Sequence, residues 1–516
     1  MSGKKLNSVQ EFYKDKTIFI TGGSGFMGKV LIEKLLYSCS DLKQIIMLMR
    51  NKRGKTAQMR IYEFEALPMF ERIMNEKPAV MNKIYPVWGD ISEPNFGLNA
   101  EHMKHVIDNT NIIFHLAASL KLEAPLKINV TMNLESVKQM CDIAKQMKNL
   151  LIMIHSSTAF CIVEHDVIEE KVYDVNEDPL NVIESTKQMS SKDLAAIQKQ
   201  RLGQHLNTYT YTKRLSEVLV RDEFKRSNLP VCIVRPSMVC PALAEPLPGW
   251  VDSLNGSPGV IIAAGRGVLR CMLMDMTATK NFIPVDLCMN GYILAAKDLG
   301  SAKERPEDIK VYNLTTHESN TITLGKFFEV VDNMKKHCPL SFGIWYPKVT
   351  ITQNKLLYYF SIILFQWIPA LLVDFLLMIF GQKRFMIKVQ KKLFTGMEVL
   401  KCFLLYNWIF KTSNFDNLLK TQSDEEYKTF FIDTKKIEPK RFFESCVIGG
   451  RVYLGKDPIS TIPRARILYK IQYVIHLLAH ALFFYWITKK FLIFTNLLDP
   501  VMGFVNNAKG LVASKF

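Results

Sequence analysis

The sequence predicts an α/β protein with a doubly wound parallel sheet and a helical, membrane-associated C-terminal domain. Two observations predict the sheet: a run of closely spaced glycines follows the short apolar segment Thr17–Thr21, and five further apolar segments of strand length occur before residue 235. Long apolar runs beyond residue 350 predict the helical part. With 516 residues, the chain is too long for one ordinary core, and we expect two or three units.

The stretch KTIFITGGSGFMG, residues 16–28, predicts a strand, a glycine turn and a helix N-terminus. Gly23, Gly25 and Gly28 fit the G-x-G-x-x-G pattern of a Rossmann-like dinucleotide site. Backbone N–H groups and the helix dipole would hold a pyrophosphate there. The alternative, a plain strand-to-helix turn, would not need three glycines in this register. The expected cofactor-binding residues of this turn are Thr21, Gly22, Gly23, Ser24, Gly25, Phe26, Met27 and Gly28.

Five more buried strands are expected along the first half of the chain. Their apolar, β-branched character is that of parallel strands covered on both faces. They are Gln44–Met49, Ile84–Val87, Asn111–Leu116, Leu150–Ile154 and Val231–Val234.

The residue after the second strand is expected to read the adenosine ribose of the cofactor. An acidic residue there would hold a 2′-hydroxyl and select NAD, but this chain has Arg50, followed by Asn51, Lys52 and Arg53. Because a guanidinium pairs with a 2′-phosphate, the sequence favours NADPH. Alternatively, Lys52 and Arg53 belong to a solvated basic loop that does not contact the cofactor.

Small and polar residues follow the third and fourth strands. Asp90 is placed either to accept a hydrogen bond from the adenine amino group or to cap the next turn. Ala117 leaves room for a cofactor close to the backbone, and His115 is expected to be packed or hydrogen-bonded rather than catalytic.

Hydroxyl groups and a tyrosine–lysine pair predict the catalytic centre. Ser157 and Thr158 follow the fifth strand, at the edge where open α/β sheets bind ligands. Tyr209 and Lys213 are four residues apart, so they share one face of a helix expected to run through Arg226. An ammonium beside a phenol is expected to lower the pKa of the phenol toward working pH.

Composition and net charge limit the classes of molecule that this protein is expected to bind. The net charge of +17 points to anionic partners, but no nucleic-acid-binding motif accompanies it, so we expect phosphorylated cofactors and an acidic membrane surface instead. The ten cysteines show neither C-x-x-C pairs nor zinc spacing. No metal site is predicted, and the thiols are expected to be reduced on the cytosolic side. The first residues carry no signal-peptide pattern.

The order of the motifs resembles the extended short-chain dehydrogenase/reductase superfamily and, within it, the alcohol-forming fatty acyl-CoA reductases. The resemblance runs from about residue 15 to about residue 455. It rests on ITGGSGFMG at 20–28, LMRNKRG at 48–54, GDIS at 89–92, FHLAAS at 114–119, HSSTAF at 155–160, NTYTYTKRLSE at 207–217, VRPSMV at 234–239, IPVDLCMNGYI at 283–293 and IPALLVDFLLMIFG at 368–381.

The resemblance implies reduction of a long-chain fatty acyl-CoA to a primary alcohol, with two NADPH consumed and CoA released. It implies that Tyr209 supplies a proton, that Thr158 or, second, Ser157 contacts the thioester oxygen, and that Lys213 contacts the nicotinamide ribose. The cofactor-binding set would further include Arg50, Asp90, Ala117, Asn129, Tyr209 and Lys213. The alternatives are an aldehyde-forming reductase, a sterol-type dehydrogenase and a non-catalytic NADP-binding membrane scaffold.

The second half predicts the membrane contacts. Residues 1–354 are expected to form the reductase domain, 355–455 a helical domain and 456–516 a tail with a membrane helix at about 467–488. Leu356–Phe380 is long enough to span a bilayer, but Gln366, Pro369 and Asp374 interrupt it. Three alternatives to a simple span remain open for Leu356–Phe380: a hairpin in the membrane interface, a cover for an acyl tunnel, and a buried helix pair.

Two further segments give information on where in the cell the protein is expected to lie. A basic helix at Lys383–Lys392 would rest on anionic headgroups or face solvent. The final Ser514-Lys515-Phe516 is a weak match to a peroxisomal address. We expect a membrane-associated protein with its catalytic domain facing the cytosol, on the endoplasmic reticulum or the peroxisome. The oligomeric state is left open.

Overall fold

The computed structural model describes residues 8–50, 54–55 and 57–494, and the statements below concern these. Residues Asn51, Lys52 and Arg53 and the C-terminal Ser514-Lys515-Phe516 lie outside the described part.

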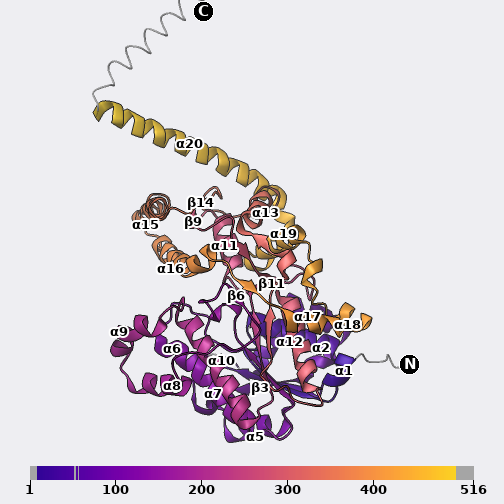
Figure 1. The fold of residues 1–516 in the computed structure, drawn as a ribbon. Helices are drawn as coiled ribbons and strands as arrows, with labels where there is room; N and C mark the ends of the chain where they lie inside the picture. Colours follow the sequence, from indigo (N-terminus) through magenta and orange to yellow (C-terminus); the bar gives the residue numbers. More distant parts are fainter. Residues whose placement is uncertain (1–7, 51–53, 56, 495–516) are drawn as a thin grey trace, which may run out of the picture.

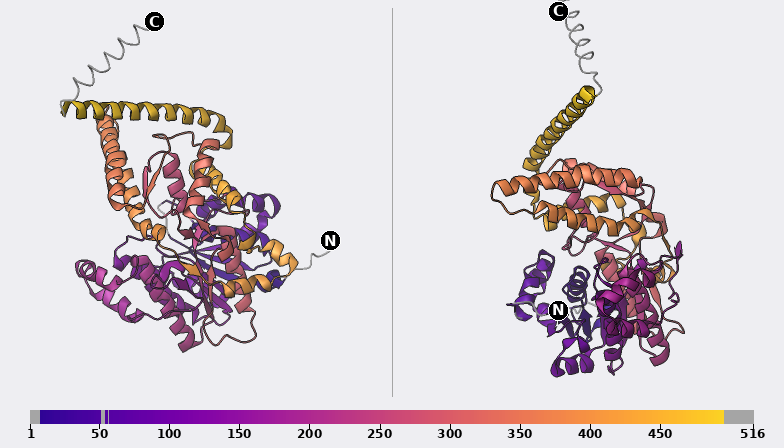
Figure 2. Two further views of the ribbon diagram at one scale, coloured as in Figure 1. Left: turned by 45° about the horizontal axis from the view of Figure 1, so that its top comes forward. Right: turned by 90° about the vertical axis from the view of Figure 1, so that its left-hand side faces the viewer.

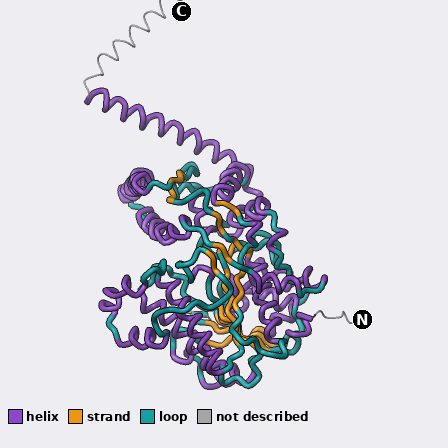
Figure 3. Tube along the Cα trace, viewed as in Figure 1, coloured by secondary structure: helices purple, strands orange, loops and turns teal. Residues whose placement is uncertain are grey.

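A seven-stranded parallel sheet forms the centre of the larger, lower body of the molecule (Figures 1 and 3). All of its six neighbouring pairs are parallel, and β1 lies between β2 and β4, where the strand order reverses. The strands, in spatial order, are β12 (Val311–Leu314), β7 (Val231–Pro236), β5 (Ile152–Ser156), β4 (Ile112–His115), β1 (Thr17–Thr21), β2 (Gln44–Met49) and β3 (Ile84–Trp88).

This sheet confirms the predicted fold class. The six predicted strands form, with ends shifted by up to two residues, and β12 is an addition that the sequence analysis did not foresee. β12 has only four residues, VYNL, too few to stand out as a period in the sequence.

Helices cover both faces of the sheet because strand side chains alternate. Ile18 and Ile20 of β1 point to one core and Phe19 points to the other. The first face is covered by α1 (Ser8–Tyr13), α2 (Phe26–Ser38), α3 (Ala57–Glu65), α4 (Glu71–Glu76) and α12 (Val285–Gly300). The second is covered by α5 (Ala100–Asn109), α6 (Leu126–Val130), the π-helical turn Thr131–Glu135, α7 (Ser136–Ala144), α8 (Pro179–Gln188), α9 (Ser191–Leu202) and α10 (Thr208–Ser227).

Short strand pairs join the sheet region to the rest of the chain. β6 (Val167–Ile168) pairs with β15 (Ile409–Phe410), and β8 (Met238–Cys240) pairs with β11 (Phe282–Pro284). The other pairs are β9 (Cys271–Leu273) with β14 (Thr350–Thr352) and β10 (Thr279–Lys280) with β13 (Ile322–Thr323).

The upper part of the molecule is helical (Figures 1 and 2). Its helices are α11 (Ser257–Gly265), α13 (Leu324–His337), α14 (Lys355–Ile362), α15 (Ile368–Ile379), α16 (Met386–Leu405), α19 (Pro439–Gly449) and α20 (Ile462–Phe494). The short helices α17 (Ser413–Lys420) and α18 (Asp424–Thr429) lie on the sheet body instead, where α17 contacts β12 and α12 (Figure 1). One apolar cluster nevertheless runs from Val9 to Val447 through both parts. The division at residues 354 and 455 therefore stays a prediction.

Two apolar runs form the helices expected from the sequence. A π-helical turn, Ile363–Trp367, joins α14 to α15, so Lys355–Ile379 is one continuous helix of 25 residues rather than a hairpin in itself. Its hairpin partner is α16, which lies beside it (Figure 1). The helix α20 projects away from the body (Figure 2). By length and composition, both runs are candidate membrane spans.

A backbone contact holds α19 against the loop that follows β8. A Cβ atom at Gly449 would lie 1.8 Å from the carbonyl oxygen of Gly249, which itself has a φ of +71°. Only a glycine pair allows the two backbones to approach so closely.

We expect Gly449→Ala to lower the free energy of unfolding by about 1–3 kcal/mol, since the added methyl group overpacks this contact. Gly396→Ala is the matched control, because a Cβ at Gly396 in α16 would meet no atom within 4 Å. Thermal unfolding of the full chain in detergent measures both. Equal melting temperatures for the two variants would contradict the contact.

Candidate active site

The glycine turn between β1 and α2 is built by close backbone approach. A Cβ atom at Gly28 would lie 2.3 Å from the carbonyl oxygen of Gly22, and one at Gly22 would lie 2.7 Å from the amide nitrogen of Ala117. Gly22 also has a φ of +76°. The sequence analysis placed Gly23, Gly25 and Gly28 in the G-x-G-x-x-G pattern, and of the glycines in this turn the structure gives the left-handed conformation to Gly22.

The first turn of α2 has room for an anion. Gly25 is its N-cap residue and supplies no side chain to bond the free N–H groups. Ser24 and Gly25 are exposed, and Phe26 and Met27 are partly buried. Unpaired N–H groups at a helix N-terminus are the donors that a pyrophosphate needs. The turn therefore fits the phosphates of a dinucleotide.

Thr21 and His115 hold the backbone next to this turn. The Thr21 hydroxyl lies 2.9 Å from His115 Nδ1 and accepts a hydrogen bond from the Ala117 N–H at 3.2 Å. Burial, and then the charge of Lys213, lower the pKa of His115 to about 3. His115 is therefore a neutral, buried and hydrogen-bonded histidine, in line with the expectation that it is packed.

A cavity of about 700 Å³ lies at the ends of β2 and β3. Arg50, Arg60 and Asp90 line it, together with Trp88, Gly89, Glu93 and Gly97. Arg60, from α3, donates from Nη1 to the Arg50 carbonyl at 2.7 Å, and within the described residues its buried Nε has no hydrogen-bond partner. Two guanidinium groups at one cavity fit the phosphate of an adenosine ribose. The sequence analysis missed Arg60, because it lies eleven residues beyond the end of β2.

Asp90 caps the turn that follows β3, which is the second of the two roles expected for it. Its Oδ1 accepts hydrogen bonds from the Ser92 N–H at 3.0 Å and from the Ser92 hydroxyl at 2.9 Å. The carboxylate thus closes the turn while also lining the cavity.

The predicted catalytic residues meet at the carboxyl end of β5. Asn207 caps α10, so the helix begins at Thr208 and turns Tyr209, Lys213 and Glu217 to one side. Lys213 is buried and donates from Nζ to the Ser156 carbonyl at 2.7 Å. Thr158 is hydrogen-bonded to Tyr209, which is partly exposed.

The electrostatics of this group differ from the expectation in one respect. Burial, and then Cys161, raise the pKa of Tyr209 above its ordinary range, and only the hydrogen bond from Thr158 opposes this. The expectation that Lys213 lowers the pKa of the phenol is thus wrong for this structure. Burial lowers the pKa of Lys213 to about 8, so its ammonium form predominates at neutral pH and is lost as the pH rises through that value.

The two hydroxyl groups at this strand end point to different partners. Ser157 is buried, hydrogen-bonded to the carboxylate of Glu217 and 3.8 Å from the Cys161 sulfur. Thr158 faces Tyr209 instead.

Asn129 does not line an open part of the site. It is fully buried, and its amide nitrogen donates to the Lys121 carbonyl at 3.0 Å and to the Thr208 hydroxyl at 2.8 Å. It thereby ties the loop after β4 to the first turn of α10. The structure places Asn129 as a support for the helix that carries Tyr209.

A buried ion pair between Arg235 and Glu217, which the sequence analysis did not assign, lies next to the candidate catalytic residues. Arg235 of β7 donates to Glu217 at 2.7 and 2.6 Å, and neither side chain is exposed. Arg235 also donates to the carbonyls of Glu169 and Lys171 at 3.0 and 2.7 Å. The pair locks α10 to the sheet and to the segment that follows β6.

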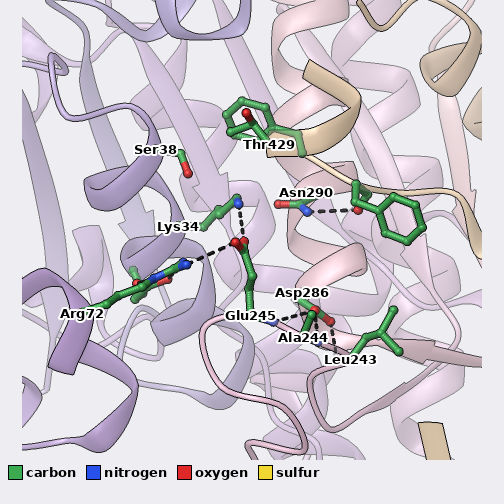
Figure 4. A network of polar contacts seen from close by, with 12 residues as sticks. Lys34, Ser38, Arg72, Leu243, Ala244, Glu245, Asp286, Asn290 and Thr429 are labelled. Carbon is green, nitrogen blue, oxygen red and sulfur yellow. Dashed lines mark hydrogen bonds and ion pairs between the residues drawn. The ribbon is translucent and has the colours of Figure 1, made fainter. Parts of the chain in front are cut away.

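A second network, shown in Figure 4, holds the loop after β8 against the cofactor-binding helix. Glu245 pairs with Lys34 of α2 and, at 3.2 Å, with Arg72 of α4. Asp286 of α12 accepts hydrogen bonds from the N–H groups of Leu243, Ala244 and Glu245 at 2.9–3.1 Å. This fixes the loop that stacks Trp250 on Phe26 of the glycine turn, with ring centroids 5.4 Å apart.

Apolar side chains close the site toward the helical part. The ring of Phe160, two residues beyond Thr158, packs against Phe403, Trp408 and Phe410 with centroids 5.3–5.7 Å apart. In the described residues no group of three or more His, Cys, Asp or Glu side chains is placed to hold a metal ion. All ten cysteines are free thiols.

Comparison with known proteins identifies the family. Two family models, both described as male sterility protein, match residues 20–292 and 365–457; the first is an NAD-binding model. Fatty acyl-CoA reductase 1 of Mus musculus is 36% identical over 460 residues, which are 89% of this chain and 88% of the relative. The chain is a fatty acyl-CoA reductase. It belongs to the extended short-chain dehydrogenase/reductase superfamily, as the motifs predicted.

Other relatives agree with this assignment. The fatty acyl-CoA reductase wat of Drosophila melanogaster is 33% identical over 485 residues, which are 93% of this reductase and 92% of that one. The terminal R domain from the myxalamid PKS-NRPS biosynthetic pathway superposes with a TM-score of 0.55 at 16% identity, covering 86% of this chain and 93% of that domain. The reductase domain of a nonribosomal peptide synthetase from Mycobacterium tuberculosis also gives a TM-score of 0.55, at 15% identity, covering 88% and 96%. These solved structures share the fold.

The family makes this chain an oxidoreductase, and the NAD-binding model supports a nicotinamide cofactor. The glycine turn, the free helix N-terminus and the cavity with Arg50 and Arg60 fit such a cofactor.

Glu217→Ala would leave Arg235 charged, buried and without its carboxylate. We expect a loss of about 3–5 kcal/mol in the free energy of unfolding, since the desolvation of Arg235 is no longer compensated. Asp142→Ala is the control, because its ion pairs with Lys138 and Lys145 are partly solvent-exposed and exposed pairs contribute about 0–1 kcal/mol. Thermal unfolding checks both, and a loss no larger than that of the control would contradict a structural role for the pair.

Proposed function

We propose that this reductase converts a long-chain fatty acyl-CoA to the primary alcohol with two equivalents of NADPH and releases CoA. The observation that carries the proposal is the meeting of Thr158, Tyr209 and Lys213 at the end of β5, beside the glycine turn. The family and the relatives' names support the acyl-CoA substrate.

NADPH, when bound, supplies the hydride for each reduction. The glycine turn Gly22–Gly28 would hold its pyrophosphate, Arg50 and Arg60 its 2′-phosphate, and Lys213 its nicotinamide ribose. Asp90 lines the same cavity as Arg50, and the Ala117 backbone lies against Gly22 of the glycine turn.

Thr158 and Tyr209 would bind the thioester carbonyl oxygen through their hydroxyl groups. As negative charge develops on that oxygen, Tyr209 donates its proton. The raised pKa of Tyr209 keeps the phenol protonated until then. Ser157 is engaged by Glu217, so the substrate role falls to Thr158.

The first reduction gives a hemithioacetal, in which carbon carries the new hydrogen, a hydroxyl group and the CoA sulfur. The carbon–sulfur bond then breaks, the hydroxyl proton leaves, and free CoA thiol and an aldehyde result. A second hydride and a second proton convert the aldehyde to the alcohol at the same residues. The apolar cluster around Phe160 supports retention of the aldehyde between the two steps.

Product analysis tests this function. The detergent-solubilised chain is incubated with NADPH and a series of long-chain acyl-CoAs, and fatty alcohol is expected. Tyr209→Phe should lower turnover by about 10²- to 10⁴-fold with NADPH binding retained, because only the donated proton is lost. Aldehyde as the sole product would contradict the second reduction, and undiminished activity of Tyr209→Phe would remove this residue from the mechanism.

The cofactor preference has its own test. Arg50→Ala is expected to weaken NADPH binding roughly tenfold or more, since it removes a charge-assisted contact to the 2′-phosphate. NADH, which lacks that phosphate, should bind nearly as before. Arg60→Ala should act in the same direction, and fluorescence titration of both nucleotides measures it. Equal weakening of NADPH and NADH would refute the assignment.

A further inference from the structure

Beyond Lys355 at its start, the continuous helix Lys355–Ile379 has a predominantly apolar outer face. Its mean hydropathy is 2.3, and only 22% of its most apolar window is buried. The exposed apolar side chains include pairs three or four residues apart and also adjacent pairs such as Leu371–Leu372 and Phe375–Leu376, so they cover a broad face of the helix. The most exposed members are Leu356, Phe360, Ile363, Leu371, Leu372, Phe375, Leu376 and Ile379, followed by Phe380.

The polar side chains in the interior of this helix face the protein, whereas Lys355 at its start is exposed. Ser361, Gln366 and Asp374 are each no more than 5% exposed. The side-chain oxygen of Gln366 accepts a hydrogen bond from the Arg270 N–H at 2.8 Å. These residues interrupt the apolar run in the sequence but not the outer face in the structure.

Asp374 closes the turn into α16. Its carboxylate accepts hydrogen bonds from the N–H groups of Phe385, Met386 and Ile387 at 2.9–3.0 Å. It thus acts as the N-terminal cap of α16 and fixes that helix alongside α15.

The inner face of the same helix packs against protein: its first part contacts β9 and its second part contacts α16. Tyr358 and Ile362 pack into a small core with Cys271 and Leu273 of β9, and Trp367 contacts Phe394 of α16. Lipid cannot surround a helix that is packed on one side against a water-soluble body. Hydrocarbon on one side and protein on the other is the situation of a helix lying in the plane of a membrane interface.

Cations flank this face. Lys383 and Arg384 follow the end of α15, and Lys388, Lys391 and Lys392 lie on α16; all five are exposed. Lysine and arginine beside an interfacial helix attract anionic headgroups. A second copy of the chain would need complementary acidic groups, whereas an anionic bilayer supplies both the hydrocarbon and the charge.

We propose that the outer face of Lys355–Ile379 lies flat in the headgroup–acyl boundary of an anionic lipid bilayer, without crossing it. This contact is separate from α20, the lower part of which docks on the body: the Trp345 indole donates to His476 at 3.1 Å, and Gln472 donates to the Gly343 carbonyl at 2.9 Å. The flat helix and α20 together orient the reductase on the membrane.

Depth measurements on the full chain test this. A fluorophore sensitive to polarity is attached to Leu356→Cys, Leu372→Cys and Phe380→Cys, each in a Cys402→Ser background, because the other nine cysteines are buried. The protein is reconstituted into phosphatidylcholine–phosphatidylserine vesicles that carry shallow or deep lipid quenchers. Lys199→Cys on α9, exposed and outside this face, is the matched control.

We expect blue-shifted emission at all three sites and stronger quenching by the shallow than by the deep lipid, with neither at Lys199→Cys. Deep quenching at Leu372→Cys with shallow quenching at the two ends would show a membrane-crossing helix and overturn the proposal. Absence of quenching at all three sites would also overturn it, and cross-linking between copies would then identify a second chain as the occupant. Acyl-CoA reduction in detergent is measured on the same proteins, so a failure of the proposed function is seen separately.

A variant with reversed charges on α16 tests the role of the cations separately. Lys388→Glu combined with Lys391→Glu and Lys392→Glu should reduce shallow quenching at Phe380→Cys several-fold in vesicles containing phosphatidylserine, and should change it little in pure phosphatidylcholine. Because α20 is unaltered, the loss is confined to this face. Equal quenching in both lipids would refute the role of the cations.

Discussion

The geometry of the proposed catalytic centre depends on the contact between α10 and the end of β5. The buried ammonium of Lys213 donates to the Ser156 carbonyl, and one turn further along the helix the carboxylate of Glu217 holds Arg235 and Ser157. Both contacts are desolvated, so their loss leaves charges that water cannot reach. They fix the height of α10 against the sheet, and therefore the position of Tyr209 relative to Thr158.

The glycine turn obeys a similar constraint on the other side of the site. Gly22 and Gly28 approach each other and Ala117 so closely that no side chain fits, while Trp250 packs on Phe26 from the loop held by Glu245 and Asp286. Cofactor and substrate sides of the site are thus joined by the loop after β8. That loop also touches α19 through Gly249, so the helical part bears on the glycine turn.

The sequence predicted the fold where local pattern decides it. A buried parallel strand followed by a glycine turn is legible in thirteen residues, and the spacing of Tyr209 and Lys213 follows from helix geometry alone. Arg60, Trp250 and the pairing of Glu217 with Arg235 were not predicted because each acts through a partner that is distant in the chain. The pKa of Tyr209 was predicted in the wrong direction since spacing does not reveal burial, which dominates it here.

The hairpin of Lys355–Ile379 and α16 connects the proposed membrane-facing surface to the candidate active site. The two helices lie side by side, and packed helices have axes about 8–10 Å apart. Phe403, near the end of α16, packs on Phe160 beyond Thr158. In the proposed orientation the apolar cluster at the catalytic hydroxyls therefore lies one helix layer behind the lipid surface. A long acyl chain would then remain among apolar groups as it passes from bilayer to cluster, while its polar CoA portion stays on the aqueous side.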